Sequence, residues 1–322
     1  IMSVILEIEK LNVSYHGTPV LKDLTLNLHK GEVLGIVGES GSGKSTLLKA
    51  IIGLLGENGR VDSGRLEFDG MNLLRLSAKK REARRRLQKI RGTRLGMVFQ
   101  NPGASFNPIR KIGVQFTEAL KSHGKVNEQE AKAQILELFA KLSLQDGARI
   151  LNSYPFELSG GMSQRVAIAL AMVMNPELLL ADEPTSALDV TVQAQCVKEM
   201  MELRSQLGTT IMIVSHNMGV VSYMADKIAV MYAGHLVEYG KKADVLNNPQ
   251  HPYTKALIGA IPSVDGGSLT SIPNCLPVFG RQNQGCPFTP RCKVAKTECA
   301  QLPILTKTYC EPEHWTLCSL TK

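Results

Sequence analysis

The chain has 322 residues, of which 43% are hydrophobic and 20% are charged, and its formal net charge is +8 at pH 7. This length suffices for one large α/β domain with an extension, and the composition is that of a soluble globular protein. The longest apolar run, Val166–Met174, is far shorter than the roughly 20 residues of a membrane-spanning helix, and no basic-then-apolar leader is present. We therefore expect neither a membrane span nor export.

Much of the excess positive charge lies in one run, Lys79–Arg94, with the sequence KKREARRRLQKIRGTR. A solvated helix face is the simplest interpretation, and contact with anionic lipid headgroups beside a membrane partner is the second. Nucleic acid is a distant third, because aromatic residues make up only 5% of the chain and do not interleave with this run. The stacking surfaces of a single-strand binder are therefore missing.

The first part of the chain has the alternation of β-strands, at Val4–Glu9, Leu11–Tyr15 and Leu24–Leu28. Glu32–Val37 is a more continuous apolar segment, as expected for a strand that is buried on both faces. It leads into a glycine-rich loop, after which Ser45–Leu55 has the pattern of a helix. This order of strand, loop and helix is the context that a phosphate-binding loop requires.

The middle of the chain, from about residue 101 to 176, is helical in pattern, and Glu128–Leu142 is its clearest amphipathic stretch. Two further buried strands are predicted at Leu178–Ala181 and Thr210–Val214, and a hairpin at Lys227–Tyr239. Because strands alternate with helices, we expect a parallel sheet that is covered by helices on both sides.

The end of the chain differs in composition from the rest. Beyond Pro262 it is rich in proline, glycine, serine and cysteine, and six of the seven cysteines lie at residue 275 or later. This change indicates a second module, with a boundary near 262–272.

The glycine-rich loop GESGSGKST, at Gly38–Thr46, contains the pattern G-x-x-x-x-G-K-S. Glycines allow backbone N–H groups to surround phosphate oxygens, and the helix that follows presents its positive end to them. We expect Lys44 to reach the β- and γ-phosphates and the Ser45 hydroxyl to bind Mg²⁺. The residues of this loop that are predicted to bind ATP are Gly38, Ser40, Gly41, Ser42, Gly43, Lys44, Ser45 and Thr46.

Two carboxylates, Asp182 and Glu183, end an apolar strand in the sequence ELLLADEP. This position places them at the carboxyl edge of the sheet, where ligands bind in open α/β folds. Asp182 is expected to hold Mg²⁺, and Glu183 to polarise the water that attacks the terminal phosphate.

A second anion-binding pattern is LSGGMSQR, at Leu158–Arg165. Ser159 is predicted to cap a long apolar helix, Met162–Met174, whose free N–H groups and dipole stabilise an anion by about 0.3–1 kcal/mol per charge at an exposed site. The phosphate loop already holds one end of a nucleotide, so this second site requires another nucleotide. Head-to-tail pairing of two subunits would satisfy both.

These three motifs, in this order, resemble the ATP-binding cassette (ABC) ATPases. The resemblance implies a P-loop α/β nucleotide-binding domain at residues 2–262, with a mixed sheet, an antiparallel β subdomain and a helical signature subdomain. A small cysteine-rich extension would follow at 263–322. In this family the signature sequence acts on the nucleotide of a second subunit, and the corresponding residues here are Ser159, Gly160, Gly161 and Gln164. Ser186 and Asp189 match the D-loop, which crosses the interface between the subunits.

The resemblance also assigns roles to three separate residues. His216, in IVSHN, resembles the switch histidine that contacts the γ-phosphate, and it completes a catalytic set with Glu183 and Lys44. Gln100, in MVFQNP, resembles the Q-loop glutamine, which touches the metal or water and lies where the membrane subunit docks. The implied Mg²⁺ ligands are therefore Ser45, Gln100 and Asp182. Tyr15 resembles the aromatic residue that stacks on adenine, with packing on the core as the alternative.

Four cysteines of the tail, Cys286, Cys292, Cys299 and Cys310, have the spacing C-x5-C-x6-C-x10-C. Disulfides are disfavoured in a cytosolic ATPase, and zinc sites usually contain a closer pair of cysteines. The segment resembles the extension of oligopeptide and dipeptide permease ATPase subunits, in which comparable cysteines bind an iron–sulfur cluster. That resemblance implies a [4Fe–4S] cluster, with zinc or unligated thiols as alternatives. Cys275 and Cys318 lie outside the pattern.

Val230–Gly240 and His251–Pro262 also resemble this peptide/nickel permease group, and the form LSGGMSQR favours the first of its two paired ATPase subunits. The implied function is to power an importer for oligopeptides, dipeptides or a related solute such as a nickel complex. The implied partners are a second ABC ATPase subunit, two transmembrane permease subunits and an extracytoplasmic substrate-binding protein, with no nucleic acid. The chain would lie peripherally on the cytoplasmic face of the membrane.

A soluble ABC-type ATPase that acts on DNA or ribosomes is the alternative. DNA-directed members carry long insertions between the phosphate loop and the signature, whereas Lys44 and Ser159 are only 115 residues apart here. Translation-associated members carry two cassettes in one chain, and this chain has one.

Overall fold

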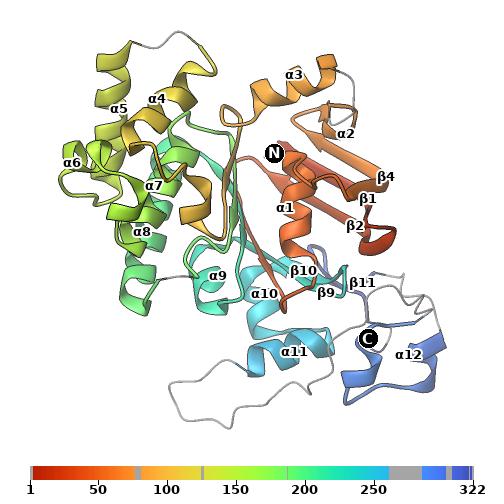
Figure 1. Cartoon of the computed structure of the whole chain (residues 1–322). Coiled ribbons are helices and arrows are strands. Elements are labelled where there is room, and N and C mark those ends of the chain that lie inside the picture. Colours follow the sequence, from red (N-terminus) through yellow and green to blue (C-terminus); the bar gives the residue numbers. More distant parts are fainter. Residues whose placement is uncertain are drawn as a thin grey trace. The chain divides into compact units, whose positions relative to one another are not determined.

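The computed structural model describes residues 3–76, 81–124, 127–186, 188–260, 285–301, 307–318 and 320 (Figure 1). These residues form two compact units. Unit 1 contains the described residues of 1–5, 29–31 and 75–214, and unit 2 contains those of 6–28, 32–74 and 215–322. Each unit has strands and helices of its own.

The strands of unit 1 are parallel and lie in the order β8 (Thr210–Val214), β7 (Leu178–Asp182) and β6 (Leu95–Val98). Every residue of β7 and β8 is buried, which accounts for the four consecutive apolar residues in each strand. The predicted parallel strands are therefore confirmed for this unit.

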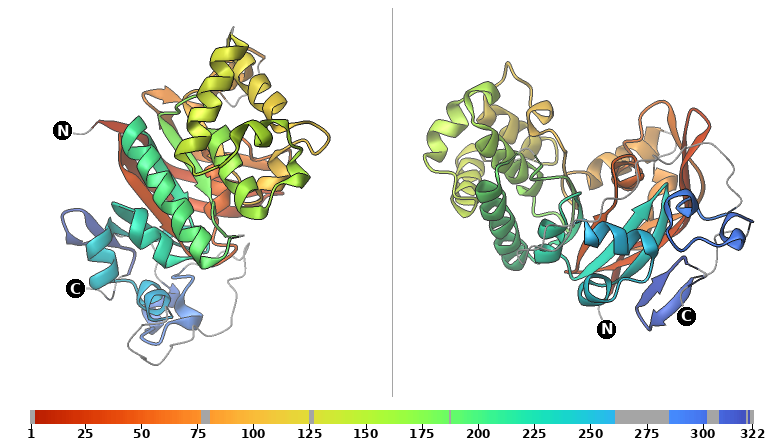
Figure 2. Two further views of the ribbon diagram at one scale, coloured as in Figure 1. Left: turned by 90° about the vertical axis from the view of Figure 1, so that its left-hand side faces the viewer. Right: turned by 90° about the horizontal axis from the view of Figure 1, so that it is seen from below.

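The helices of unit 1 include the predicted helical region. They are α3 (Arg81–Ile90), η1 (Pro102–Ser105), α4 (Ile112–Lys121), α5 (Glu128–Lys141), α6 (Gly147–Asn152), η2 (Pro155–Glu157), α7 (Gly160–Met172) and α8 (Val190–Leu207). Helices α4, α5 and α6 pack on one another (Figure 1). The rings of Phe116 and Phe139 meet edge-on, with their centroids 5.4 Å apart. Figure 2 shows α8 as one long uninterrupted helix.

The basic run lies largely on α3. Its apolar residues Leu87 and Ile90 are buried, whereas Arg81, Arg84 and the other arginines of the helix are exposed. This arrangement is consistent with a solvated helix face.

A four-stranded sheet in unit 2 has the order β2 (Thr18–His29), β1 (Val4–Tyr15), β4 (Gly59–Phe68) and β5 (Met71–Asn72). Strand β4 pairs antiparallel with both β1 and β5, which makes this the antiparallel β subdomain that the resemblance implied. The short helix α2 (Leu73–Leu76) follows β5.

The second group of strands in unit 2 has the order β11 (Thr308–Glu311), β12 (His314–Thr316), β10 (His235–Lys241), β9 (Lys227–Tyr232) and β3 (Val33–Val37). Strands β3 and β9 are parallel, whereas β9, β10, β12 and β11 are antiparallel to their neighbours, so the sheet is mixed. Because β12 pairs with β10, the end of the chain belongs to the same unit as the phosphate loop. The predicted boundary at 262–272 lies outside the described residues.

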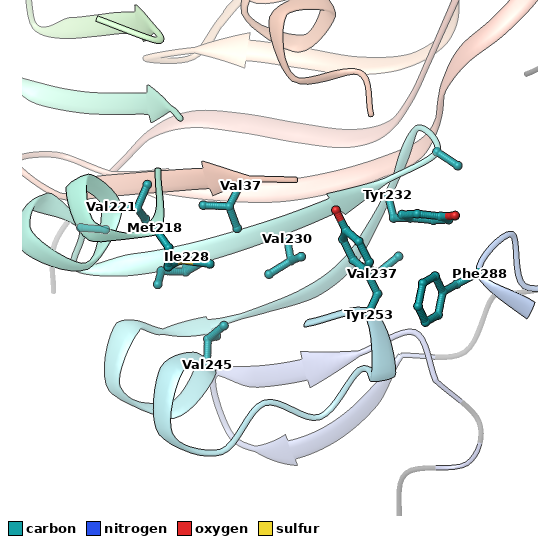
Figure 3. Close-up of a cluster of buried hydrophobic side chains, with 12 residues drawn as sticks. Val37, Met218, Val221, Ile228, Val230, Tyr232, Val237, Val245, Tyr253 and Phe288 are labelled. Atoms are coloured by element: carbon teal, nitrogen blue, oxygen red, sulfur yellow. The ribbon is translucent and has the colours of Figure 1, made fainter. Parts of the chain in front are cut away.

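The helices of unit 2 complete its core. They are α1 (Lys44–Ile52), α9 (Met218–Met224), α10 (Lys242–Asn247), α11 (Pro252–Gly259), η3 (Thr289–Arg291) and α12 (Thr297–Gln301). A cluster of buried side chains joins Val37 of β3 and Val221 of α9 to Tyr232, Tyr253 and Phe288 (Figure 3). Phe288 is only 2% exposed and comes from the cysteine-rich tail, so the tail contributes to this core.

Among the residues that the structure describes, no helix is long and apolar enough to cross a membrane.

The turn between β9 and β10 packs closely against the phosphate loop. Gly234 has a φ of +84°, its N–H donates to Ser42 O, and a Cβ there would lie 2.2 Å from the Val20 carbonyl oxygen. Gly70 has a similar φ of +75° but nothing within 4 Å of its Cβ position.

We expect Gly234→Ala to lower the free energy of unfolding by at least about 2 kcal/mol more than Gly70→Ala, because both add backbone strain but only the first adds overlap. Urea denaturation of the two variants measures this difference. Equal losses of stability would contradict the packing described here.

Candidate functional site

The phosphate loop runs from the end of β3 at Val37 to the start of α1 at Lys44. Gly38, Gly41 and Gly43 all have positive φ, of 152°, 79° and 103°. A Cβ at Gly38 would lie 2.2 Å from Met231 O, and one at Gly43 would lie 2.7 Å from a methyl group of Leu21. The backbone therefore requires glycine for its conformation and also for the closeness of its neighbours.

The ammonium group of Lys44 is buried inside this loop, with the residue only 5% exposed. Its Nζ donates to the carbonyl oxygens of Gly38, at 2.8 Å, and of Glu39, at 2.9 Å. The Ser42 hydroxyl is also buried, and it has no hydrogen-bond partner among the described residues. A buried cation next to a buried hydroxyl with unused capacity suits a phosphate group, so the residues present fit the predicted ligand.

The predicted carboxylates end strand β7 in unit 1. Asp182 is its last residue and is 4% exposed, and Glu183 follows with a φ of +47°. The Glu183 N–H donates to Val214 O at the end of β8, at 2.9 Å. Gln100 Nε2 donates to Glu183 Oε2 at 3.3 Å, so the structure brings these two predicted residues together.

The signature sequence forms the start of α7, as predicted. Ser159 is the N-cap residue, and its hydroxyl accepts a hydrogen bond from the Met162 N–H at 3.3 Å. Ser159 and Gly160 are exposed, and nothing lies within 4 Å of a Cβ built on Gly160. A Cβ on Gly161 would meet Val192 Cγ1 at 3.1 Å, within the same unit.

Gln164, another residue of the signature, differs from Ser159 and Gly160 in its exposure. Gln164 is fully buried, and neither its amide nitrogen nor its amide oxygen has a hydrogen-bond partner among the described residues. It lies in the second turn of α7, beyond the exposed first turn, and its side chain reaches no outer surface. The contact of Gln164 with a second nucleotide, which the resemblance implied, therefore stays a prediction.

The remaining predicted residues lie at the ends of helices and strands. Ser186 Oγ donates to Glu183 O at 3.2 Å, and Asp189 caps α8 by accepting from the N–H groups of Thr191 and Val192. Both Ser186 and Asp189 are exposed.

Two predicted residues belong to unit 2. His216 is exposed and follows Ser215, whose N–H donates to Ile36 O of β3 at 3.2 Å, so it leaves the sheet near the strand that enters the phosphate loop. Tyr15 ends β1 opposite Gly59 and is half-buried.

The cysteine tail does not form the predicted metal site among the described residues, where no group of three or more histidine, cysteine, aspartate or glutamate side chains could hold a metal ion. Burial raises the pKa of the Cys286 thiol, and Cys318, Cys292 and Cys299 lie near enough to raise it further. The pKa of Cys310 is raised by burial and by Glu238 and Glu311, not by the other thiols. The groups that raise the pKa of Cys286 thus include Cys318, which lies outside the predicted ligand set. Cys275 lies outside the described residues.

Sequence reasoning missed the surroundings of Glu39, which occupies one of the open positions of the phosphate-loop pattern. Its carboxylate accepts hydrogen bonds from Arg291, and its N–H donates to Tyr253 Oη at 2.8 Å. The sequence did contain one signal, the acidic residue Glu39 within a loop that is predicted to bind phosphate. Such a carboxylate would repel phosphate unless a cation neutralised it.

Comparison with known families identifies two regions of the chain. Residues 21–186 match the family described as "ABC transporter", and residues 237–299 match "Oligopeptide/dipeptide transporter, C-terminal region". The first region contains the phosphate loop, the signature and the two carboxylates. The second ends inside the cysteine-rich tail.

The similarity to known proteins covers almost the whole chain. The oligopeptide transport ATP-binding protein OppD of Salmonella typhimurium is 41% identical over 310 residues, which cover 94% of this chain and 90% of that protein. The dipeptide transport ATP-binding protein DppD of Lactococcus lactis is 41% identical over 298 residues, covering 90% and 84%. The dimeric structure of the ATP-binding cassette MJ0796 bound to ADP and Pi has a TM-score of 0.65 and 28% identity, covering 74% of this chain and 99% of that one.

The position of Lys44 leads to a binding test. Lys44→Ala removes the cation from the loop, so we expect the full-length variant to bind a fluorescent triphosphate nucleotide roughly 10- to 100-fold more weakly, the size of a lost charged hydrogen bond. Lys49→Ala, in the last turn of the same helix, is the control and should bind as the unaltered chain does. Equal affinities of the two variants would refute the role of Lys44.

Proposed function

Because the chain belongs to the ABC transporter family, whose members are ATPases, we propose that it is the ATP-hydrolysing subunit of an importer for oligopeptides or dipeptides. The observation that carries this proposal is the joint presence of the two family regions, at residues 21–186 and 237–299. The relatives that match along nearly the full chain are named as oligopeptide or dipeptide transport ATP-binding proteins. These names do not favour an ATPase that acts on DNA or ribosomes.

ATP is held at its phosphates by the loop of unit 2. Lys44 lies at the centre of the loop, and displacement of its two carbonyl partners by phosphate oxygens would turn its charge toward the nucleotide. The amides and hydroxyls of Gly38, Ser40–Ser42 and Ser45–Thr46 supply the remaining donors, and Tyr15 supplies a stacking surface for the base.

Hydrolysis needs a group that orients the attacking water and groups that stabilise the charge of a loose transition state. We assign the first role to Glu183, whose carboxylate is already oriented by Gln100. His216 would contact the terminal phosphate. The resemblance implies that Ser45, Gln100 and Asp182 would hold Mg²⁺, which when bound would supply positive charge to offset that of the phosphates.

The active sites are completed by pairing with another ATPase subunit. The exposed first turn of α7 offers the Ser159 hydroxyl and the N–H groups of Gly160 and Gly161, which suit the phosphates of a nucleotide held by a partner. Ser186 and Asp189 lie in the segment that leads into α8 and cross the same interface. A heterodimer is favoured by the form of the signature.

The remaining partners follow from the import function. They are two transmembrane permease subunits, which bring this chain to the cytoplasmic face of the membrane as a peripheral subunit, and an extracytoplasmic substrate-binding protein. A small solute such as a nickel complex is the second class of cargo, because the cargo is selected by those partners.

A [4Fe–4S] cluster in the tail, with zinc as the alternative, stays a prediction from the resemblance alone. The described cysteines do not support the ligand set Cys286, Cys292, Cys299 and Cys310. No part of the hydrolytic mechanism depends on it.

The role of Glu183 and the transport function are tested together by Glu183→Gln. The change preserves shape and removes the base, so we expect ATP binding and pairing to persist while turnover falls by at least about 100-fold. In membrane vesicles that contain the assembled transporter, ATP-driven uptake of a labelled dipeptide or oligopeptide should be lost with it. Normal hydrolysis in a fully substituted pair would exclude Glu183 as the base, and failure of the unaltered assembly to take up either class would exclude the proposed cargo.

Pairing through the signature is tested by Gly160→Ala. The chain itself leaves open space around this Cβ, so the stability of the isolated chain should not fall. A methyl group would intrude on a partner's nucleotide, so ATP-dependent pairing and turnover should fall by at least about tenfold. Gly124→Ala, also in unit 1 with open space at its Cβ, should change neither quantity. Unchanged turnover of the Gly160 variant would contradict the paired arrangement.

A further inference from the structure

A bidentate ion pair joins the phosphate loop to the cysteine-rich tail within unit 2. Arg291 Nη1 lies 2.7 Å from Glu39 Oε2, and Arg291 Nη2 lies 2.8 Å from Glu39 Oε1. The Arg291 side chain is only 5% exposed and that of Glu39 is 25% exposed. This is the geometry in which arginine binds a carboxylate most strongly and with the greatest directional specificity.

Aromatic side chains hold this ion pair in place. The Arg291 guanidinium lies 5.8 Å from the centroid of the Tyr232 ring and 6.0 Å from that of Phe288, and Nη1 donates to Tyr232 Oη at 3.3 Å. Tyr253 packs against both rings and accepts the Glu39 N–H (Figure 3). The interaction with Glu39 also raises the pKa of Arg291, so the guanidinium stays charged.

Glu39, which binds Arg291 through its carboxylate, also binds Lys44 through its backbone carbonyl. Its carbonyl oxygen accepts from Lys44 Nζ at 2.9 Å and from the Ser42 N–H at 3.1 Å. The side chain, the N–H and the carbonyl of this one residue are therefore bound to the tail, to α11 and to the phosphate loop respectively. A shift of Arg291 would move the residue that helps to hold Lys44.

The tail presents Arg291 from a tight turn. The Thr289 N–H donates to Cys286 O at 3.0 Å, and the Arg291 N–H donates to Phe288 O at 2.9 Å. The Cys286 N–H in turn donates to Cys299 O at 2.7 Å, and the buried Phe288 anchors the turn in the core of unit 2. Arg291 is thus fixed by the fold of the tail and does not reach Glu39 from a mobile arm.

The electrostatic consequence concerns the charge of the loop. A free carboxylate in a phosphate-binding loop would repel the negative charges of a triphosphate, and a repulsion of about 1.4 kcal/mol suffices to weaken binding tenfold. We propose that Arg291 is a positioning residue of the ATP site: by neutralising and fixing Glu39, the C-terminal tail sets the affinity of the phosphate loop for ATP.

This inference rests on the proposed function, because it assigns the tail a part in the same ATP site. A purely structural role for Arg291, as an anchor of the tail, makes a different prediction. In that case the loss of Glu39 could not compensate for the loss of Arg291.

The test measures equilibrium binding of a fluorescent ATP analogue to the full-length chain. Arg291→Gln leaves the Glu39 carboxylate uncompensated, so the dissociation constant should rise on the order of tenfold. Arg291→Lys, which keeps the charge, should lie between this variant and the unaltered chain. Adding Glu39→Gln to Arg291→Gln removes the repulsive charge and should restore most of the affinity.

Glu313→Gln is the matched control. Glu313 also ties the tail to the body of unit 2, through Lys227 at 3.3 Å and Lys241 at 3.2 Å, but it does not contact the phosphate loop. Its nucleotide affinity should equal that of the unaltered chain, and thermal unfolding of every variant reports whether the tail remains folded.

Two outcomes would overturn the inference: an Arg291→Gln variant that binds as tightly as Glu313→Gln, or a double variant that is as weak as Arg291→Gln alone. If Arg291→Gln does not fold, Arg291→Lys is compared with Glu39→Gln. The inference then requires that Arg291→Lys binds the ATP analogue more weakly than the unaltered chain and that Glu39→Gln does not. Failure of the unaltered chain to bind the nucleotide would instead refute the proposed function.

Discussion

The nucleotide site depends on one buried ammonium group, that of Lys44. A lysine charge is rarely tolerated at 5% exposure unless polar groups surround it, and here two carbonyl oxygens of its own loop do so. Those carbonyls can face inward only because the neighbouring glycines adopt positive φ and leave no room for side chains. The loop is therefore held in a shape that suits phosphate by its own lysine, and the Ser42 hydroxyl retains hydrogen-bonding capacity for a ligand.

The elements that keep the loop in this shape come from distant parts of the chain. The loop follows strand β3, and the Gly234 N–H at the β9–β10 turn donates to Ser42 O. Tyr253 of α11 and Arg291 of the tail both bind Glu39. Because β12 pairs with β10, the tail is part of the unit that carries the loop. In unit 2 the described part of the cysteine-rich segment thus packs with the elements that carry the phosphate loop.

The exposed start of α7 explains why the protein is expected to act in pairs. A capped helix terminus that faces outward and is flanked by glycines offers N–H groups to an anion, but it lies in unit 1, whereas the phosphate loop lies in unit 2. Gln164, in the second turn of the same helix, is fully buried. In the proposed function, a second subunit completes each site.

The sequence by itself determined the parts that depend on local pattern: the glycine loop between β3 and α1, the cap at Ser159, the buried strands β7 and β8, and the carboxylates at the end of β7. Strand β4 escaped notice because most of its residues are not buried, and buried residues alternate with a less buried one only at its end, around Glu67. Only the tertiary structure decided which distant side chains meet. Glu39 and Arg291 are 252 residues apart in the sequence and form an ion pair, and Gln164 is fully buried. The periodicity of a sequence reflects hydrogen bonding and burial along one helix or strand. Contacts between distant residues, such as Glu39 and Arg291, depend on how the helices and strands pack together.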